Sequence, residues 1–243
     1  MNIVYCVSEN WMNYIPIQIH ALRRHNPGYL YIYIISKNFT NADRTMLLDL
    51  SIHLGDTKVF LLNCNDQFAK VNGRFTEYTM FRLMIPKLLP LAHKCLYLDA
   101  DTLVVSDITE MYNKAIPIVA GVIDKGYNNI KKREIGLLPS HNYINAGVIL
   151  MNLEAIRSRK IDESWERLSK IPHPCNDQDV INLTHENEVV VLDKIYNSSK
   201  STGITAKPKI VHYAGNKGLH WVHKLPQANF WVEATQYYYK NKQ

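Results

Sequence analysis

Two aspartates, Asp99 and Asp101, directly follow the apolar run 95–98 and are separated by a single small residue. In open α/β sheets ligands bind outside the carboxyl ends of the strands, so this position favours a binding site. Carboxylates at positions i and i+2 of an extended segment point to the same side and repel each other unless a cation lies between them. Such oxygen ligands suit Mg²⁺ or Mn²⁺, which would neutralise a departing diphosphate. The alternative is a strand end at which the aspartates merely cap turns.

A histidine, His212, ends another apolar run, 210–212, and precedes Gly215 and Lys217. An imidazole is a suitable third ligand for Mn²⁺, and a lysine can bind phosphate as a point charge. We therefore expect His212 to join the two aspartates. An ordinary histidine at a strand end would have the same pattern.

Two further segments carry side chains suited to sugar hydroxyl groups. The small, polar triplet 145–147 (Asn-Ala-Gly) opens an apolar strand, and segment 176–179 (Asn-Asp-Gln-Asp) opens an expected helix. A single Asn or Asp at that helix start would be the usual N-cap. Three amide or carboxylate side chains in succession instead favour recognition of a sugar.

Two common nucleotide-binding patterns are missing from the chain. The sequence contains neither GxxxxGK[ST] nor a GxGxxG after its first strand, which excludes a P-loop and the usual dinucleotide fingerprint. With only 10 glycines, the protein is expected to hold phosphates mainly through a metal and side chains.

Apolar runs typical of strands alternate along the chain with segments of helical periodicity. We expect strands at 3–7, 29–35, 58–62, 95–98, 116–123, 144–151, 189–192 and 210–212. We expect helices around 15–22, from 40 or 41 to 54 with Gly55 as the cap, around 81–88 with a restart at Pro86, and around 161–168. Near-continuous apolar strands in this alternation favour a parallel sheet covered on both faces. The polar stretch 124–141 is expected to form a long surface loop.

The composition fits one folded α/β domain. The chain has 243 residues, of which 47% are hydrophobic and 21% charged, so it can bury a full core and is not expected to be disordered. The four cysteines lie far apart and form no CxxC pair, which argues against a zinc ribbon and a disulfide scaffold. We expect reduced, mostly buried thiols in a cytoplasmic protein, because no apolar run reaches the ~18 residues of a membrane span and the N-terminus lacks signal-peptide features.

The positive charge is concentrated at the C-terminal end of the chain. Residues 207–243 contain six lysines and one acidic residue, Glu233, which accounts for nearly all of the net charge of +6. The rest of the chain is close to neutral, so we expect no nucleic-acid partner. Because this segment is also rich in Trp and Tyr, it suits peripheral contact with the inner face of an anionic membrane. A C-terminal helix packed by its aromatics and solvated by its lysines fits equally well.

Taken together, these motifs resemble the family 8 glycosyltransferases, which include bacterial lipopolysaccharide galactosyl- and glucosyltransferases and glycogenin. The resemblance covers nearly the whole chain. It rests on six segments in the family's order, 8–11 (Ser-Glu-Asn-Trp), 81–86 (Phe-Arg-Leu-Met-Ile-Pro), 97–101 (Tyr-Leu-Asp-Ala-Asp), 145–148 (Asn-Ala-Gly-Val), 177–179 (Asp-Gln-Asp) and 212–215 (His-Tyr-Ala-Gly). Each segment alone is weak, whereas the ordered set is specific.

The resemblance implies a GT-A fold, a Rossmann-like open mixed α/β sheet with helices on both faces. This would be a single domain, 1–243, with 207–243 as its basic aromatic C-terminal segment. The resemblance also implies a UDP-glucose or UDP-galactose donor, a Mn²⁺ (or Mg²⁺) cofactor and retention of anomeric configuration. The acceptor would be a hydroxyl of a glycan, glycolipid or glycoprotein in bacterial lipopolysaccharide or glycan biosynthesis.

The resemblance also assigns roles by position. Asp99, Asp101 and His212 would bind the metal, and Trp11 would stack on uracil. The full donor-binding set would be Val7, Ser8, Asn10, Trp11, Arg82, Asp99, Ala100, Asp101, Asn145, Ala146, Asp177, Gln178, His212, Gly215 and Lys217. Its catalytic candidates would be Arg82, Asn145, Asp177 and Gln178. Two departures concern Ser8, where the family commonly has Asp, and Lys217, which precedes the family's usual lysine position.

For the chemical step we favour attack by the acceptor hydroxyl from the face that UDP leaves. The alternative is a covalent intermediate on Gln178 or Asp177, but an amide oxygen is a poor nucleophile. Two rival functions share part of the pattern. A haloacid dehalogenase-type phosphatase also places DxD after an apolar strand, but normally near the N-terminus and with Thr or Val where Leu103 stands. A non-catalytic sugar-nucleotide or glycan-binding protein would have no evident need for all three expected metal ligands.

Overall fold

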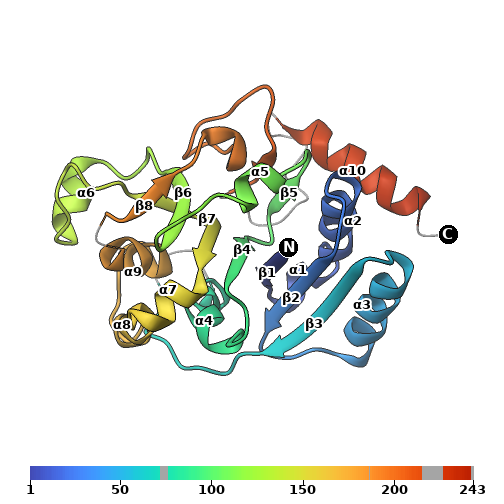
Figure 1. The fold of residues 1–243 in the computed structure, drawn as a ribbon, viewed down its shortest axis with the longest axis horizontal. Helices are drawn as coiled ribbons and strands as arrows, with labels where there is room; N and C mark the ends of the chain where they lie inside the picture. The colour runs from blue at the N-terminus through green and yellow to red at the C-terminus, as the bar shows by residue number, and fades with distance from the viewer. Residues whose placement is uncertain (72–75, 186, 215–226, 242–243) are drawn as a thin grey trace.

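The computed structural model of the protein describes residues 1–71, 76–185, 187–214 and 227–241 (Figure 1). Seven strands form one sheet in the order β3-β2-β1-β4-β7-β6-β8. They are β1 (Asn2–Cys6), β2 (Leu30–Ser36), β3 (Thr57–Asn63), β4 (Lys94–Leu98), β6 (Val119–Ile123), β7 (Ile144–Asn152) and β8 (Val189–Val191). Each overlaps a predicted strand, and the largest difference is β6, which begins at Val119 instead of residue 116.

Helices cover both faces of this sheet, as predicted. They are α1 (Glu9–Met12), α2 (Ile15–His25), α3 (Asn41–His53), the 3-10 helix η1 (Glu77–Met84), α4 (Ile85–Leu88), α5 (Thr109–Tyr112), α6 (Asn129–Glu134), α7 (Leu153–Ser158), α8 (Ile161–Leu168), α9 (Asn176–Thr184), the 3-10 helix η2 (Lys194–Tyr196) and α10 (Ala228–Lys240). Because side chains alternate along a strand, β1 sends Ile3 and Tyr5 into the core beneath α2 and α3. Val4 and Cys6 enter the opposite core, with η1, α4 and α7–α9.

The direction of the strands differs from the parallel sheet that the apolar runs predict. Strand β1 is parallel to β2 and β4, but β7 is antiparallel to both β4 and β6. The sheet is therefore mixed, as the resemblance implies. Strands buried on both faces have the same apolar pattern in either direction, so composition alone could not predict the reversal at β7.

Local signals fixed several element boundaries. Thr40 and Asp43 form a reciprocal capping box at the start of α3, and Gly55 follows the helix with φ +63°, in the left-handed region that glycine favours. Pro86 lies in the first turn of α4, so the predicted restart is confirmed. The stretch 124–141 is not a loop throughout, because Asn128 accepts hydrogen bonds from two backbone amides and initiates α6.

A second sheet of two antiparallel strands, β5 (Thr102–Val104) and β9 (Ile210–His212), lies beside α2 and α10 (Figure 1). Helix α10 buries Trp231 and Tyr238 in this cluster, which is the packing that the helix alternative for the C-terminal segment predicts. Contact of the segment with a membrane remains a prediction. Among the described residues, no helix combines the length and the apolar character needed to cross a bilayer.

Candidate active site

A cavity of about 500 Å³ opens at the edge of the sheet where β1 and β4 end and β7 begins. Because β7 is antiparallel to β4, its first residues lie beside the last residues of β4. The backbone N–H of Asp99 accordingly donates to the carbonyl of Gly147 at 2.8 Å. The strand reversal thus brings the triplet 145–147 next to the two aspartates.

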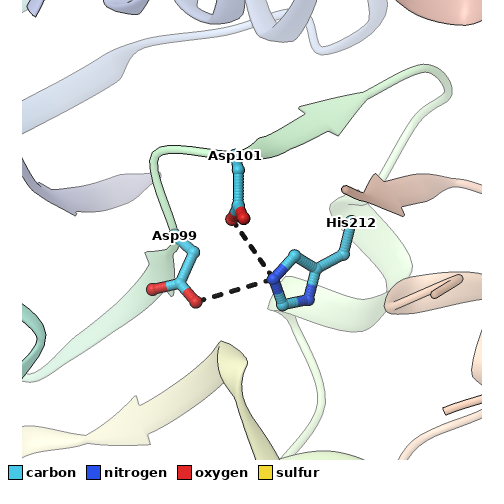
Figure 2. Close-up of side chains that lie close together, drawn as sticks. All are labelled: Asp99, Asp101 and His212. Atoms are coloured by element: carbon cyan, nitrogen blue, oxygen red, sulfur yellow. Dashed lines mark ion pairs between the residues drawn. The ribbon is translucent and has the colours of Figure 1, made fainter. Parts of the chain in front are cut away.

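Asp99, Asp101 and His212 converge at this cavity, as predicted. Figure 2 shows the two carboxylates and the imidazole pointing toward one another. The Nε2 atom of His212 lies 3.2 Å from Oδ1 of Asp101 and 3.6 Å from Oδ2 of Asp99. One ligand atom from each residue lies within 4.8 Å of the other two. Two carboxylate oxygens and one imidazole nitrogen form a donor set that suits Mn²⁺ or Mg²⁺.

The aspartates reach the same side by a turn and not by the extended backbone that we expected. The backbone N–H of Thr102 donates to the carbonyl of Asp99 at 3.0 Å and closes this turn. Strand β5 then pairs Thr102 with His212, which places the imidazole beside Asp101. From α2, the fully buried Gln18 donates through Nε2 to the carbonyl of Ala100 and holds the middle of the turn.

The two carboxylates of this cluster stabilise a positive charge beside them. Burial disfavours the imidazolium form, yet the carboxylates of Asp101 and Asp99 outweigh burial and raise the pKa of His212. Burial likewise opposes ionisation of Asp101, but His212 outweighs it and lowers the pKa of this carboxyl. A proton on His212 or a divalent cation would each compensate the two carboxylates.

Gly147 leaves the space that this cluster needs. A Cβ atom at this position would lie 2.1 Å from Cε1 of His212 and 2.9 Å from Oδ2 of Asp99. Both distances are shorter than non-bonded contact, so any side chain would displace a ligand. The residues present therefore fit a metal ion by donor chemistry and by shape.

Arg82 contacts the cluster through Asp99 and is almost completely buried. Its Nη2 is 2.8 Å from Oδ1 of Asp99, and its Nε is 2.9 Å from Oδ2 of Asp177. A third contact runs from Nη1 to the carbonyl of Ala146. Burial raises the pKa of Asp177 to about 6 despite the attraction of Arg82, with a smaller contribution from Asp99. One cation thus balances the buried carboxylate of Asp177 and the partly buried carboxylate of Asp99.

The sequence model of glycosyl transferase family 8 matches residues 2–218. The chain belongs to this family. Its fold is the GT-A fold.

Two relatives and one solved structure that are similar to this chain are also glycosyltransferases. The lipopolysaccharide glucosyltransferase WaaO of Escherichia coli is 25% identical over 264 residues, which cover 96% of this chain and 77% of the relative. The glycosyltransferase GlyE of Streptococcus pneumoniae is 24% identical over 208 residues, 80% of this chain and 47% of GlyE. Among solved structures, the galactosyltransferase LgtC in complex with donor and acceptor sugar analogues superposes with a TM-score of 0.82 at 21% identity. This superposition covers 97% of this chain and 95% of LgtC.

Most of the donor-binding residues that the family 8 resemblance assigns line the cavity. These are Ser8, Trp11, Arg82, Asp99, Ala100, Asp101, Asn145, Ala146, Asp177, Gln178 and His212. Val7 is fully buried, with its N–H donated to Ile35, and the exposed Asn10 lies on α1, so neither of them lines the cavity. Gly215 and Lys217 lie outside the described residues. The roles of all these residues in this family 8 chain remain predictions.

Asn145 and Gln178 belong to one hydrogen-bond network. The Oε1 atom of Gln178 accepts from the N–H of Ala146 at 3.0 Å and from Nδ2 of Asn145 at 3.2 Å. The Nε2 atom of Gln178 donates to Oδ2 of Asp124 at 3.2 Å, and Asn145 donates to the same oxygen at 3.1 Å. Both amides are therefore held in defined orientations at the cavity wall.

Sequence reasoning missed Asp124, although a signal for it existed. Asp124 directly follows β6, which ends at the same edge of the sheet because β6 is antiparallel to β7. The rule that located Asp99 at a strand end would also have selected this residue. Asn197 and Gln18 had no such signal, since one follows a short 3-10 turn and the other lies on a helix that packs into the core.

Proposed function

We propose that this protein is a metal-dependent, retaining glycosyltransferase that moves glucose or galactose from a UDP-sugar to a hydroxyl of a glycan, glycolipid or glycoprotein acceptor. The observation that carries the proposal is the convergence of Asp99, Asp101 and His212, with ligand atoms within 4.8 Å of one another, at a cavity of about 500 Å³. A cavity of this volume lies within the usual range for small-molecule sites.

Asp99, Asp101 and His212 would hold Mn²⁺ or Mg²⁺, and the bound cation would neutralise the charge that develops on the departing diphosphate. Arg82 keeps Asp99 in place through Oδ1 and leaves Oδ2 directed at His212. Ser8 and Trp11 also line the cavity and would provide a polar group and an aromatic ring for the uracil base. Asn145, Asp177 and Gln178 would face the donor sugar.

The contacts of Gln178 and Asp177 support attack from the face that UDP leaves. Both acceptor directions of Gln178 Oε1 are used by Ala146 and Asn145. Asp177 is 5% exposed and paired with Arg82. A nucleophile must approach the anomeric carbon freely. Gln178 Oε1 cannot do so without breaking its two hydrogen bonds, and Asp177 is almost completely buried. The acceptor hydroxyl therefore acts as the nucleophile and passes its proton to a phosphate oxygen.

The names of the relatives support the choice of sugar and acceptor. WaaO is a lipopolysaccharide glucosyltransferase and LgtC is a galactosyltransferase. A glucose or galactose donor and a lipid-linked glycan acceptor are therefore the first substrates to test. We place the protein in the cytoplasm, where such an acceptor would be presented by the inner face of the membrane.

A panel of UDP-sugars tests the function directly. UDP release is measured with and without acceptor, with Mn²⁺ or with EDTA, and the anomeric configuration of the product is determined by NMR. We expect release from UDP-glucose or UDP-galactose that needs the metal and gives an α-linked product. A non-catalytic binding protein would bind the UDP-sugar but release no UDP even with acceptor.

The exposed side of α10 is the surface on which we propose membrane contact. Val232 is 42% exposed and Tyr239 is 61% exposed, whereas Trp231 and Tyr238 face the core. Substitution of Val232 and Tyr239 by Ser should weaken sedimentation with anionic vesicles and leave UDP release unchanged. The control is Ile52→Ser, which changes a 73% exposed apolar residue on α3. Equal sedimentation of all three proteins would reject the contact.

A further inference from the structure

A single buried side chain, Asn197, connects His212 to the donor-sugar side of the cavity. The Nδ1 atom of His212 lies 2.9 Å from Oδ1 of Asn197, and Nδ2 of Asn197 donates to Oδ1 of Asn145 at 2.9 Å. Asn197 is 0% exposed, and His212 and Asn145 are also buried. Bulk water therefore does not compete for these hydrogen bonds.

The backbone fixes the direction of every hydrogen bond in this chain. The N–H of Gly147 donates to the same Oδ1 atom of Asn145 at 3.0 Å. A backbone N–H is always a donor, so the atom of Asn145 that it meets must be the carbonyl oxygen. The group of Asn197 that faces this oxygen must then be its NH₂. It follows that the oxygen of Asn197 faces His212.

The other half of Asn145 gives the same answer independently. The N–H of Ala146 donates to Oε1 of Gln178, which fixes this atom as an oxygen. The atom of Asn145 that faces Gln178 Oε1 and Asp124 Oδ2 must therefore be its NH₂. Two neighbouring backbone amides thus set the orientation of Asn145 from opposite sides.

The orientation of the Asn197 amide, with its oxygen toward His212, determines which ring nitrogen of His212 carries the hydrogen. An amide oxygen only accepts hydrogen bonds, so the Nδ1 atom that faces Asn197 must carry the hydrogen. In the neutral imidazole the lone pair is then on Nε2. Nε2 is the atom that faces Asp99 and Asp101, at 3.6 Å and 3.2 Å.

Backbone contacts hold Asn197 beside β9. The N–H of His212 donates to the carbonyl of Ser198 at 3.0 Å, and the N–H of Ser198 donates to the carbonyl of Ile210 at 2.9 Å. The hydroxyl of Thr202 donates to the carbonyl of Asn197. The backbone, and not a ligand, therefore sets the position of the asparagine in this structure.

We infer that Asn197 is a positioning residue that locks His212 in the Nδ1–H tautomer, so that Nε2 is available to the metal. At its other end the same side chain holds Asn145 at the donor pocket, so one residue couples the two halves of the site. The inference rests on the proposed metal-dependent function. Outer partners of this kind typically contribute 10- to 100-fold to metal affinity.

The tautomer is measured in metal-free, wild-type protein. Long-range ¹H–¹⁵N NMR of histidine-labelled protein distinguishes protonated from unprotonated ring nitrogens, and the His212→Asn variant identifies the signals of His212. The pH is raised until these signals stop changing, so that the ring is neutral. We expect the hydrogen on Nδ1. A hydrogen on Nε2 would overturn the inference without any reference to metal or activity.

Two variants test the two hydrogen bonds of the Asn197 side chain separately. Asn197→Leu keeps the approximate size but cannot accept from His212. Asn197→Asp still accepts from Nδ1, but its second oxygen cannot donate to Asn145. We expect Asn197→Leu to weaken Mn²⁺ binding, followed by EPR of the free ion, by about 10- to 100-fold. Asn197→Asp should keep the tautomer and the Mn²⁺ affinity and raise the KM for the UDP-sugar.

The matched control is Asn26→Leu, which removes another fully buried asparagine with a hydrogen bond at each end, to Leu22 and Ile108. This variant should lose stability and keep the Mn²⁺ affinity of the wild type. Equal Mn²⁺ affinity in Asn197→Leu and wild type would overturn the inference, and so would equal losses in Asn197→Leu and Asn197→Asp. Should Asn197→Leu fail to fold, the wild-type tautomer still decides. An Nδ1–H ring in a protein that binds no Mn²⁺ would contradict the proposed function while the assigned tautomer still held.

Discussion

Arg82 pairs with Asp99 through only one of the two carboxylate oxygens. Nη2 of Arg82 lies 2.8 Å from Oδ1, while Oδ2 faces Nε2 of His212 at 3.6 Å. The arginine therefore orients the carboxylate and leaves free the oxygen that we assign to the metal. Since Nε of the same guanidinium is 2.9 Å from Oδ2 of Asp177, this single side chain links the metal position to the donor-sugar wall.

Replacement of Arg82 by Met tests this link. The variant leaves the buried Asp177 without a counter-ion, so the free energy of unfolding should fall by about 3–5 kcal/mol. UDP release should fall by about 10- to 100-fold even where the protein is folded, because Asp99 Oδ1 then keeps only the hydrogen bond from the Tyr97 hydroxyl. The control Arg159→Met removes a pair with Glu188 in which both side chains are more than 40% exposed, and should cost about 0–1 kcal/mol. Similar losses in the two variants would contradict this account of Arg82.

Gly147 is predicted to tolerate no side chain. In Gly147→Ala the new methyl would lie 2.1 Å from Cε1 of His212, so a ligand must move by about 1 Å or more. We expect a loss of about 100-fold in UDP release and weaker Mn²⁺ binding in an EPR titration. Gly121→Ala is the control, because its methyl would press on the side chain of Ile144 at 2.8 Å and not on the metal position. Mn²⁺ binding that is the same in both variants would show that the geometry around Gly147 is misassigned.

The raised pKa of Asp177 predicts an acid limit to activity. With a pKa of about 6, this carboxyl is ionised above that pH and protonated below it. Protonation removes the charge that Arg82 balances, so kcat/KM should decline as the pH falls through about 6. The profile of Asp177→Asn should be lower and should lack this decline, whereas Asp49→Asn, on the exposed side of α3, should keep it. An unchanged acid limb in Asp177→Asn would assign the titration to another group.

Two buried histidines predict how stability depends on pH. Burial, and next the proximity of His53 and His141 respectively, lowers the pKa of His20 and of His185 to about 4, below the ordinary value of 6.5. Between these values the unfolded chain binds protons that the folded chain does not, so the free energy of unfolding falls as the pH drops from 6.5 toward 4. Urea titrations of His185→Gln should show a weaker pH dependence than wild type. The control is His93→Gln, because the side chain of His93 is 81% exposed; this variant should retain the wild-type dependence. The same pH dependence of the free energy of unfolding in wild type and both variants would refute the assignment to His185.

Much of the fold followed from local patterns. Each strand of the main sheet was indicated by an apolar run, and α3 by the Thr40 cap and Gly55. The direction of β7 could not be predicted in this way, because a fully buried strand carries no signal for its neighbour's direction. That reversal is what sets Gly147 beside Asp99, so the architecture of the site depended on information that composition did not contain.

The site itself was predicted in part. Asp99, Asp101 and His212 were identified from residue type and position at strand ends, and the structure brings them together. Asn197 could not be found, because its importance depends on a contact with His212 across 15 positions of the chain. Neither hydrophobic periodicity nor a helix cap marks such a residue in the sequence. Its hydrogen bonds in the folded structure identify it.

The central claim is that Asp99, Asp101 and His212 hold a metal that transfer requires. The most direct test measures UDP release from UDP-glucose and UDP-galactose by metal-stripped protein as Mn²⁺ is added, for wild type, Asp101→Asn and the surface control Asp49→Asn. We predict that Mn²⁺ restores release in wild type and in the control, and that Asp101→Asn loses about 100-fold or more at the same metal concentration. Full transfer activity of Asp101→Asn with Mn²⁺ would contradict the assignment of the site.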